Sequence, residues 1–165
     1  MERLWAPWRS AYVTGASGGD TGCIFCDIDR PGRGELVLVR GRVTYVLLNL
    51  YPYNNGHLMV VPYRHIPNLA ATTADEQAEL MRFTRDAEIA LTEAYRPQGI
   101  NMGINLGRPA GAGVVDHVHI HAVPRWNGDT NFMTAIGNTR VLPEDLAATK
   151  KRLQPIFERL AASNA

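Results

Sequence analysis

Three histidines alternate with apolar residues in the run His117-Val118-His119-Ile120-His121. In a β-strand, successive side chains point to opposite faces, so the three imidazoles would share one face while Val118 and Ile120 enter a core. Imidazole is partly unprotonated near neutral pH, so such a row suits nucleophilic attack, acid–base catalysis or metal ligation. The alternative is an exposed polar strand face that happens to use histidine and carries no site.

The other two of the five histidines, His57 and His65, flank one predicted strand upstream. His57 follows the turn-forming residues 52–56 and opens a strand that can lie beside the triplet. All five histidines thus lie in or beside these segments, which favours a catalytic or metal site over an exposed polar face.

The two cysteines lie three positions apart, as Cys23 and Cys26. A Cys-x-x-Cys pair is half of a tetrahedral zinc site, and His65 and His117 are the candidates to complete it. Four protein ligands leave no open coordination position, so the metal would be structural and would hold the N-terminal segment to the sheet. The alternative is a pair of ordinary reduced cysteines. A thioredoxin-like redox role is disfavoured because no βαβ pattern surrounds the pair.

The elements that must hold these residues indicate an α+β domain. Two β-rich runs form a hairpin, a long helix separates the third strand from the fourth, and a further helix follows the fifth. A capping box at Thr73 and Glu76 begins the long helix and Pro97 ends it, while Pro155 should kink or interrupt the last helix. The predicted strands are residues 36–39, 43–48, 57–61, 99–106 and 114–123, and the last helix begins near Pro143. They form a five-stranded, mainly antiparallel sheet.

Composition fits a single globular domain. The chain has 165 residues, of which 45% are hydrophobic and 20% charged, and its formal net charge is +1. This balance argues against a protein that coats nucleic acid, and no apolar run approaches the ~20 residues that span a bilayer. The N-terminus has no continuous apolar segment of the signal-peptide kind. We expect a cytoplasmic protein with an N-terminal arm (1–22), a core (23–125) and a C-terminal extension (126–165).

Several segments together resemble the histidine triad superfamily. The triplet, followed by two apolar residues, matches the signature His-x-His-x-His, and loops at 105–107 and 110–111 resemble the phosphate-side loop. Residues 4–9 and 124–133 are similar to the branch that contains bacterial diadenosine tetraphosphate phosphorylases and hydrolase-like relatives. The segment 49–65 resembles the nucleotide-pocket segment, with four residues at the expected offsets: Asn49, Gly56, His57 and Pro62.

The resemblance implies a histidine-triad-like fold and nucleotidyl transfer or hydrolysis through a covalent nucleotidyl-histidine. His119 would attack the α-phosphorus of diadenosine tetraphosphate or another AMP derivative. His121 would donate a hydrogen bond as negative charge moves onto the leaving group, and His57 would lie behind and fix the nucleophile's strand. The residues implied for nucleotide binding are Asn49 at the ribose, Asn105, Gly111 and Gly113 at the phosphates, and Trp126 at a second base.

The resemblance further implies a homodimer whose two sheets join, a structural zinc on Cys23, Cys26, His65 and His117, and no organic cofactor. No nucleic-acid or membrane partner is expected. The chain departs from the phosphorylase branch at Ala112-Gly113, where that branch carries Gly-Ser. No hydroxyl side chain stands just before the triplet. The sequence therefore does not decide whether phosphate or water accepts the nucleotidyl group.

Two other hypotheses use the same residues differently. A metal-dependent hydrolase would use His117, His119 and His121 as ligands of a catalytic metal, but such sites want a nearby carboxylate. After His121 the first acidic residue is Asp129, which disfavours this hypothesis. A non-catalytic adaptor that binds nucleotides without turnover is the other alternative, and retention of His119 argues against it.

Overall fold

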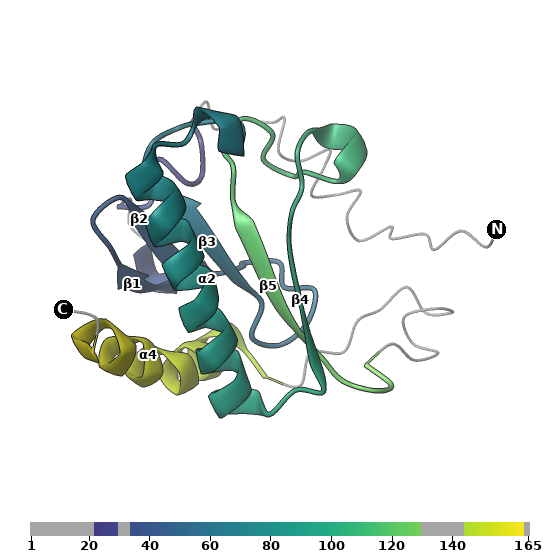
Figure 1. Ribbon diagram of the computed structural model, residues 1–165. Coiled ribbons are helices and arrows are strands. Elements are labelled where there is room, and N and C mark those ends of the chain that lie inside the picture. The colour runs from purple at the N-terminus through teal and green to yellow at the C-terminus, as the bar shows by residue number, and fades with distance from the viewer. Residues whose placement is uncertain (1–21, 30–33, 130–143, 164–165) are drawn as a thin grey trace.

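Five strands form one sheet in the order β1-β2-β3-β5-β4, and every neighbouring pair is antiparallel (Figure 1). The structure is a computed structural model that describes residues 22–29, 34–129 and 144–163. The strands are β1 (Val37–Arg40), β2 (Thr44–Leu48), β3 (Leu58–Pro62), β4 (Gly99–Ile104) and β5 (Ile120–Arg125). The long helices are α2 (Ala74–Tyr95) and α4 (Leu146–Ser163). Three short 3-10 helices of one turn each are η1 (Gly34–Leu36), η2 (Leu69–Ala71) and η3 (Arg108–Ala110). The predicted α+β fold class is confirmed.

Both long helices cover one face of this sheet, and α4 lies against α2 and β1 (Figure 1). Alternation along the strands sends one set of side chains under the helices and the other set to the opposite face. The helix-side core includes Val46, Leu48, Leu58, Val60, Ile120 and Ala122 of the sheet, Phe83 and Leu91 of α2, and Leu153 and Phe157 of α4. On the opposite face, Tyr45, Leu47, Met59 and Val61 pack with Phe25 in a smaller cluster. That second face also receives the histidines.

The boundaries of α2 follow the predicted signals. The side chain of Thr73 accepts the backbone N–H of Glu76, and the Glu76 side chain accepts the backbone N–H of Thr73. Arg96 ends the helix in a left-handed conformation (φ 45°), directly before Pro97. The capping box and the proline stop are both confirmed.

Glu76 also pairs with Arg64, and this pair should make the stability of the fold dependent on pH. Arg64 donates to both carboxylate oxygens of Glu76, at 2.8 and 2.9 Å. These hydrogen bonds lower the pKa of Glu76 from 4.5 to about 2. A carboxylate with a depressed folded pKa contributes stability above its unfolded pKa, and the contribution is lost as pH falls from 4.5 toward about 2.

We therefore expect Glu76→Gln, which can still cap α2, to lower the free energy of unfolding by about 1–2 kcal/mol at pH 7. Urea titration at pH 7 and pH 3 measures this, and the deficit should shrink at the lower pH. Glu88→Gln, at an exposed glutamate of the same helix, is the control and should change little. A deficit of equal size at both pH values would contradict the assignment.

The fifth strand is shorter than predicted. It begins at Ile120 rather than Val114: pairing with β4 ends with that strand at Ile104, and pairing with β3 reaches no further than Val60 although β3 continues to Pro62. Before that point the backbone turns to another partner, and the N–H of Val118 donates to the carbonyl of Ile66 (2.7 Å). Only the last of the three histidines is therefore inside a strand. The fourth strand likewise ends at Ile104 rather than Leu106.

The last helix begins at Leu146, with Asp145 accepting the N–H of Ala148 on its carboxylate (2.7 Å). The predicted start, Pro143, lies outside the described residues, as does the arm at 1–22 apart from Gly22. Pro155 was predicted to kink or interrupt the last helix, and it does not interrupt it, since α4 continues through Pro155. Pro155 removes the donor to the carbonyl of Lys151, and both residues are exposed, so water can replace that donor. Within the described ranges no helix has the length and apolar character to cross a membrane.

Candidate active site and metal cluster

Three of the predicted catalytic residues, His57, His119 and His121, meet on the face of the sheet opposite α2 and α4. His57 directly precedes β3, His121 lies in β5, and His119 stands just before β5. The ring centroids of His57 and His121 are 5.1 Å apart, and those of His119 and His121 are 4.8 Å apart. All three side chains are buried. The structure thus places two imidazoles of the triplet and one from upstream in a single row.

The protonation of His57 is fixed by its neighbours. Its Nδ1 receives the backbone N–H of Tyr53 (3.0 Å), while Nδ2 of Asn49 lies 3.3 Å from Nδ1 and 3.5 Å from Nε2. The amide of Asn49 is itself oriented, because its Oδ1 accepts the N–H of Tyr51 (2.9 Å). A backbone N–H can only donate, so Nδ1 must accept from Tyr53 and the ring proton sits on Nε2. Burial, reinforced by the neighbouring His121 and His119, lowers the pKa of His57 to about 3, so the ring stays neutral.

This arrangement dictates where His121 carries its proton. Nε2 of His57 lies 2.9 Å from Nδ1 of His121, and because His57 donates there, Nδ1 of His121 must accept. The proton of His121 is then on Nε2. The N–H of His121 then lies on the nitrogen that does not face His57, and protonating its Nδ1 would break the bond to His57.

The opposite arrangement holds at His119. Its Nδ1 lies 2.8 Å from the carbonyl oxygen of His117, which can only accept, so Nδ1 carries the proton and Nε2 is a bare lone pair. Burial lowers the pKa of His119 below its usual value, which favours the neutral ring. The ring of Phe25 packs 4.9 Å from that of His119, centroid to centroid. A neutral imidazole with an unprotonated ring nitrogen is a nucleophile.

The four predicted metal ligands are also brought together. Nδ1 of His117 lies 3.3 and 3.6 Å from the sulfur atoms of Cys23 and Cys26, and Nδ1 of His65 lies 3.3 Å from Cys26 Sγ. All four ligand atoms lie within 4.8 Å of one another. Bond lengths of 2.0–2.3 Å around a tetrahedral zinc would separate neighbouring ligand atoms by about 3.3–3.8 Å. The cluster therefore has the donor set and spacing to bind a metal ion.

Two further features fit a cation at this cluster. Nε2 of His117 donates to the carbonyl of Pro62 (2.8 Å), which leaves its Nδ1 lone pair directed at the sulfur atoms. The pKa of the Cys26 thiol is raised to about 11, first by burial and then by the adjacent Cys23. Two adjacent thiols resist ionising together unless a cation neutralises them.

The metal cluster and the nucleophile share His117 and Phe25. The side chain of His117 belongs to the cluster while its carbonyl orients His119. Phe25, which lies between the two cysteines, contacts His117 (5.4 Å between centroids) as well as His119. The sequence analysis missed Phe25, although its place within the Cys-x-x-Cys turn was a signal. It also missed Tyr53, whose ring lies 4.5 Å from that of His57 and whose contribution to tautomer selection is a backbone group.

The predicted nucleotide-binding residues fall into two groups. Asn49 contacts His57, and Asn105 lies in the loop before the triplet, where its Nδ2 is 3.5 Å from the carbonyl of Gly111. The N–H of Gly111 donates to the carbonyl of Arg108 (2.9 Å). Among the described residues the N–H of Gly113 makes no hydrogen bond, so this donor is available to a ligand.

Trp126 lies elsewhere. It follows the last residue of β5, at the opposite end of that strand from His119, and its ring packs edge-on against Tyr95 at the end of α2 (6.2 Å). Its neighbour Arg125 forms a two-point ion pair with Asp129, at 2.6 and 2.9 Å. The structure does not bring Trp126 to the histidines.

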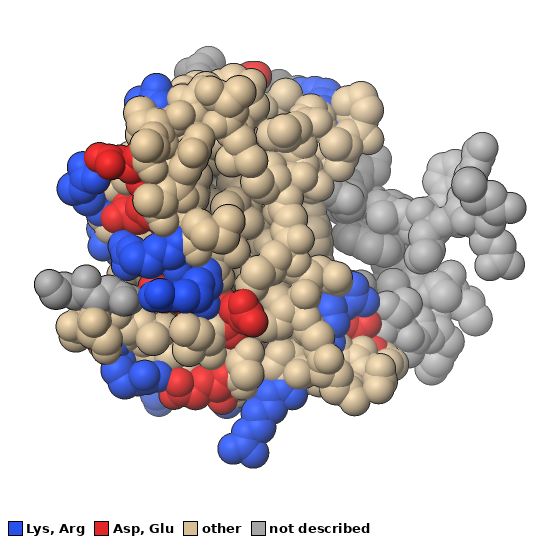
Figure 2. Space-filling view, viewed as in Figure 1, with Lys and Arg blue, Asp and Glu red and all other residues tan. Residues whose placement is uncertain are grey.

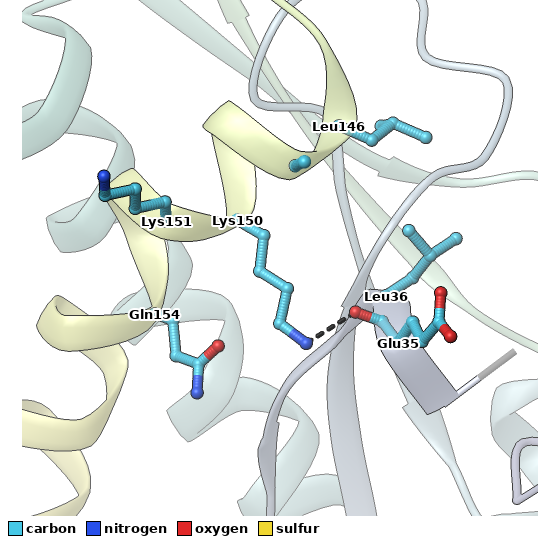
Figure 3. Close-up of a pocket in the computed structure, with 7 residues that line it drawn as sticks. Glu35, Leu36, Leu146, Lys150, Lys151 and Gln154 are labelled. Atoms are coloured by element: carbon cyan, nitrogen blue, oxygen red, sulfur yellow. Dashed lines mark hydrogen bonds between the residues drawn. The ribbon is translucent and has the colours of Figure 1, made fainter. Parts of the chain in front are cut away.

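The hollows on the helix side of the molecule are separate from this row of histidines. One, of about 550 Å³, lies between η1 and the first turns of α4, where Lys150 donates to the carbonyl of Glu35 (2.5 Å) (Figure 3). It is lined by Glu35, Leu36, Leu146, Ala147, Lys150, Lys151 and Gln154. On this side of the molecule, basic and acidic side chains are interspersed around α4 rather than gathered by sign (Figure 2).

Comparison with known proteins agrees with this geometry. The AP-4-A phosphorylase of Mycobacterium tuberculosis (strain CDC 1551 / Oshkosh) is 44% identical over 167 residues, covering 96% of this chain and 86% of that protein. The asymmetrical bis(5'-nucleosyl)-tetraphosphatase of Schizosaccharomyces pombe is 32% identical over 58% of this chain and 52% of that protein. A crystal structure of a Zn-bound histidine triad family protein from Mycobacterium smegmatis matches with a TM-score of 0.68 and 26% identity, covering 88% of this chain and 99% of that one. The model of the HIT domain matches residues 35–128, and the chain therefore belongs to the HIT domain family.

Proposed function

We propose that this chain is a nucleotidyl hydrolase or transferase that acts on the α-phosphate of dinucleoside polyphosphates or other AMP derivatives. One arrangement carries the proposal: the ring centroids of His119 and His121 lie 4.8 Å apart, and the hydrogen bonds of the two rings assign the lone pair of His119 and the proton of His121 to Nε2. A nucleophile next to a hydrogen-bond donor is the pair that phosphoryl-group substitution needs. The AP-4-A phosphorylase and the tetraphosphatase among the relatives support an enzyme that processes dinucleoside polyphosphates.

In the first step, Nε2 of His119 attacks the α-phosphorus and a P–N bond forms. The bond from phosphorus to the bridging oxygen breaks, and its electron pair stays on the leaving polyphosphate. The N–H of His121 stabilises the charge that develops on that oxygen, and no proton needs to move because a polyphosphate is stable as an anion. The nucleotidylated ring is cationic, and the carbonyl of His117 at Nδ1 stabilises it.

In the second step, an acceptor oxygen attacks the same phosphorus and the P–N bond breaks. Its electron pair returns to Nε2 of His119, which restores the starting state. Orthophosphate as acceptor gives phosphorolysis, and water, which releases a proton to solvent, gives hydrolysis. The free N–H of Gly113 can bind a phosphate oxygen where a hydroxyl side chain is lacking.

We propose that four residues bind the nucleotide beside the two catalytic histidines. Asn49 is proposed at the ribose, and Asn105, Gly111 and Gly113 form the loop at the phosphates. His57 fixes the tautomer of His121 from behind. Trp126 has no role in this proposal because it packs on Tyr95 at the far end of β5.

Product analysis with diadenosine tetraphosphate, with and without phosphate, tests the proposed function. ADP plus ATP that appear only with phosphate would identify a phosphorylase. AMP plus ATP regardless of phosphate would identify a hydrolase. If the dinucleotide stays intact, and AMP phosphoramidates and AMP esters do as well, the enzyme proposal fails and tight AMP binding would favour the adaptor.

A structural zinc is proposed on Cys23, Cys26, His65 and His117. The donor set and the ligand spacing support it, as does the Zn-bound relative. Four protein ligands leave no position for substrate or water, so the metal would hold the Cys23–Cys26 turn in place and take no part in the chemical step.

A homodimer is proposed through the edge strand β4. Among the described residues this strand pairs only with β5, and most of its residues are exposed although it is rich in Gly, Ile and Met. Met102 is 38% exposed, and within the same part of the chain nothing lies within 4 Å of the position a Cβ would take at Gly103. An unpaired apolar edge is a template for another strand, and a second copy of β4 would extend the sheet.

Met102→Lys should therefore convert the dimer to monomer at micromolar concentration, as measured by sedimentation equilibrium. Met81→Lys is the matched control, because Met81 is 66% exposed on α2 and should leave the dimer intact. A monomeric parent protein, or two variants that behave alike, would contradict the proposed interface.

A further inference from the structure

The turn that precedes His57 is fastened to the far end of β5 by one buried side chain. Asn54 is 9% exposed, and its Nδ2 donates to the carbonyl of Pro124 (3.2 Å) and to Oδ2 of Asp129 (3.0 Å). Asp129 is in turn held by the two-point ion pair with Arg125. Both N–H groups of the Asn54 amide are thus used to join this turn to β5.

The backbone of the same turn holds His57. The carbonyl of Asn54 accepts the N–H of His57 (3.2 Å), and the N–H of Tyr53 reaches Nδ1 of the His57 ring (3.0 Å). The peptide that carries the Tyr53 donor is therefore positioned from one side by the anchored Asn54. A shift of this peptide by an ångström would lengthen the Tyr53 hydrogen bond beyond its useful range.

A weaker Tyr53 hydrogen bond would also change which nitrogen of His121 carries the proton. If the donor at Nδ1 of His57 is weakened, the proton of His57 can move to Nδ1, because the Asn49 amide lies at nearly equal distances from Nδ1 (3.3 Å) and Nε2 (3.5 Å) and holds neither tautomer. Nε2 of His57 would then accept from Nδ1 of His121, and Nε2 of His121 would become a bare lone pair. A lone pair directed at a leaving oxygen repels the developing charge that an N–H would stabilise.

We infer that Asn54 is a positioning residue for nucleotidyl transfer: by clamping the Tyr53–His57 turn to β5, it keeps the proton of His121 on the nitrogen that faces the leaving group. This inference rests on the proposed function for its kinetic consequence. The tautomer assignment itself can be measured without substrate.

Asn54→Ala removes the clamp, and Asn55→Ala is the matched control. Asn55 is the next residue of the same turn, and its side-chain oxygen is buried without a hydrogen-bond partner among the described residues. Two measurements are needed: ¹⁵N NMR of the histidine side chains without substrate, and kcat and KM for two AMP esters. One ester carries a nitrophenolate leaving group, which needs little stabilisation, and the other an alkoxide, which needs much.

We expect Asn54→Ala to populate the Nδ1–H form of both His57 and His121, and Asn55→Ala to leave their spectra unchanged. For the alkyl ester, Asn54→Ala should lower kcat about tenfold, with KM nearly constant, because a donor to the leaving oxygen is partly lost. For the nitrophenyl ester the loss should be less than about threefold, since that leaving group depends less on the donor.

Unchanged tautomers together with equal losses for both esters would overturn the inference and leave Asn54 a purely structural residue. If Asn54→Ala does not fold, Asn54→Asp is the second variant, since it keeps the size of the side chain but sets a carboxylate against Asp129. Its expected result is the same pair of changes. If the parent protein turns over none of the nucleotides, the proposed function fails, whereas the NMR comparison still decides whether Asn54 controls the tautomers.

Discussion

Replacing His119 with alanine should lower turnover of diadenosine tetraphosphate by about 10⁴-fold or more, the scale seen when a covalent nucleophile is removed. The imidazole supplies the atom that bonds to phosphorus, and no other described side chain beside it offers a bare nitrogen. Within the part of the chain that the structure describes, its side chain hydrogen-bonds only to the carbonyl of His117, so the substitution removes one hydrogen bond there. Steady-state product formation by chromatography measures the effect.

His121→Ala is the comparison that separates a nucleophile from a hydrogen-bond donor. Its loss should be smaller, about 10²–10³-fold, and should shrink with a better leaving group. For His119→Ala, thermal unfolding and metal content should stay close to those of the parent protein. Turnover that survives undiminished in His119→Ala would sink the covalent mechanism. Equal losses in both variants for every leaving group would contradict the distinct roles.

His65→Ala should release the metal and destabilise the fold. His65 is exposed and contacts Cys26 and the ring of His117, so the substitution removes a metal ligand that makes no direct contact with His119 among the described residues. A bound metal stabilises the native state by a few kcal/mol, so its loss lowers the unfolding temperature of a domain of this size by about 10 °C or more. Metal analysis after dialysis, together with calorimetry, measures both quantities.

Catalysis should also fall when the metal is lost, because His117 and Phe25 connect the cluster to His119. His65→Cys is the matched control: it restores a four-donor set of three thiolates and one imidazole, which zinc accepts, and should recover the metal and most of the stability. The account is contradicted if the parent protein purifies without metal under metal-replete conditions. Equal unfolding temperatures with and without a chelator would contradict it as well.

Local patterns in the sequence predicted the order of the elements and which histidines and cysteines lie close together. The period-two alternation of the triplet predicted that His119 and His121 share a face, and they lie 4.8 Å apart. The capping box predicted the start of α2 at the correct residue. The four metal ligands were predicted from donor type and spacing, and they converge. Each of these depends on a few consecutive residues or on donor chemistry alone.

Features that depend on distant partners were not predictable in this way. The start of β5 at Ile120 is set by where β3 and β4 stop pairing, which no pattern within residues 114–119 reveals. The selection of tautomers depends on the N–H of Tyr53, and every non-proline residue has such a group. Asn54 looked like a turn residue, and only the fold shows that its amide reaches β5, 70 residues later.

Arg125 and Trp126 are residues whose types suit ligand binding but whose side chains contact other parts of the chain. Trp126 was predicted at a second base from the resemblance, and the guanidinium of Arg125 has the chemistry to bind a phosphate. The turn closed by Gly128, which has a left-handed φ of 78°, returns Asp129 to Arg125 and satisfies the guanidinium internally. The residue type does not reveal whether the side chain already pairs with another residue of the same chain.

The stereochemical course at the α-phosphorus tests the central claim most directly. A substrate made chiral at that phosphorus by sulfur and ¹⁸O is converted by the protein, and the configuration of the product is determined by ³¹P NMR. Two in-line displacements, first by His119 and then by the acceptor, predict overall retention of configuration. Inversion would mean a single direct displacement by the acceptor and would contradict the covalent nucleotidyl-histidine.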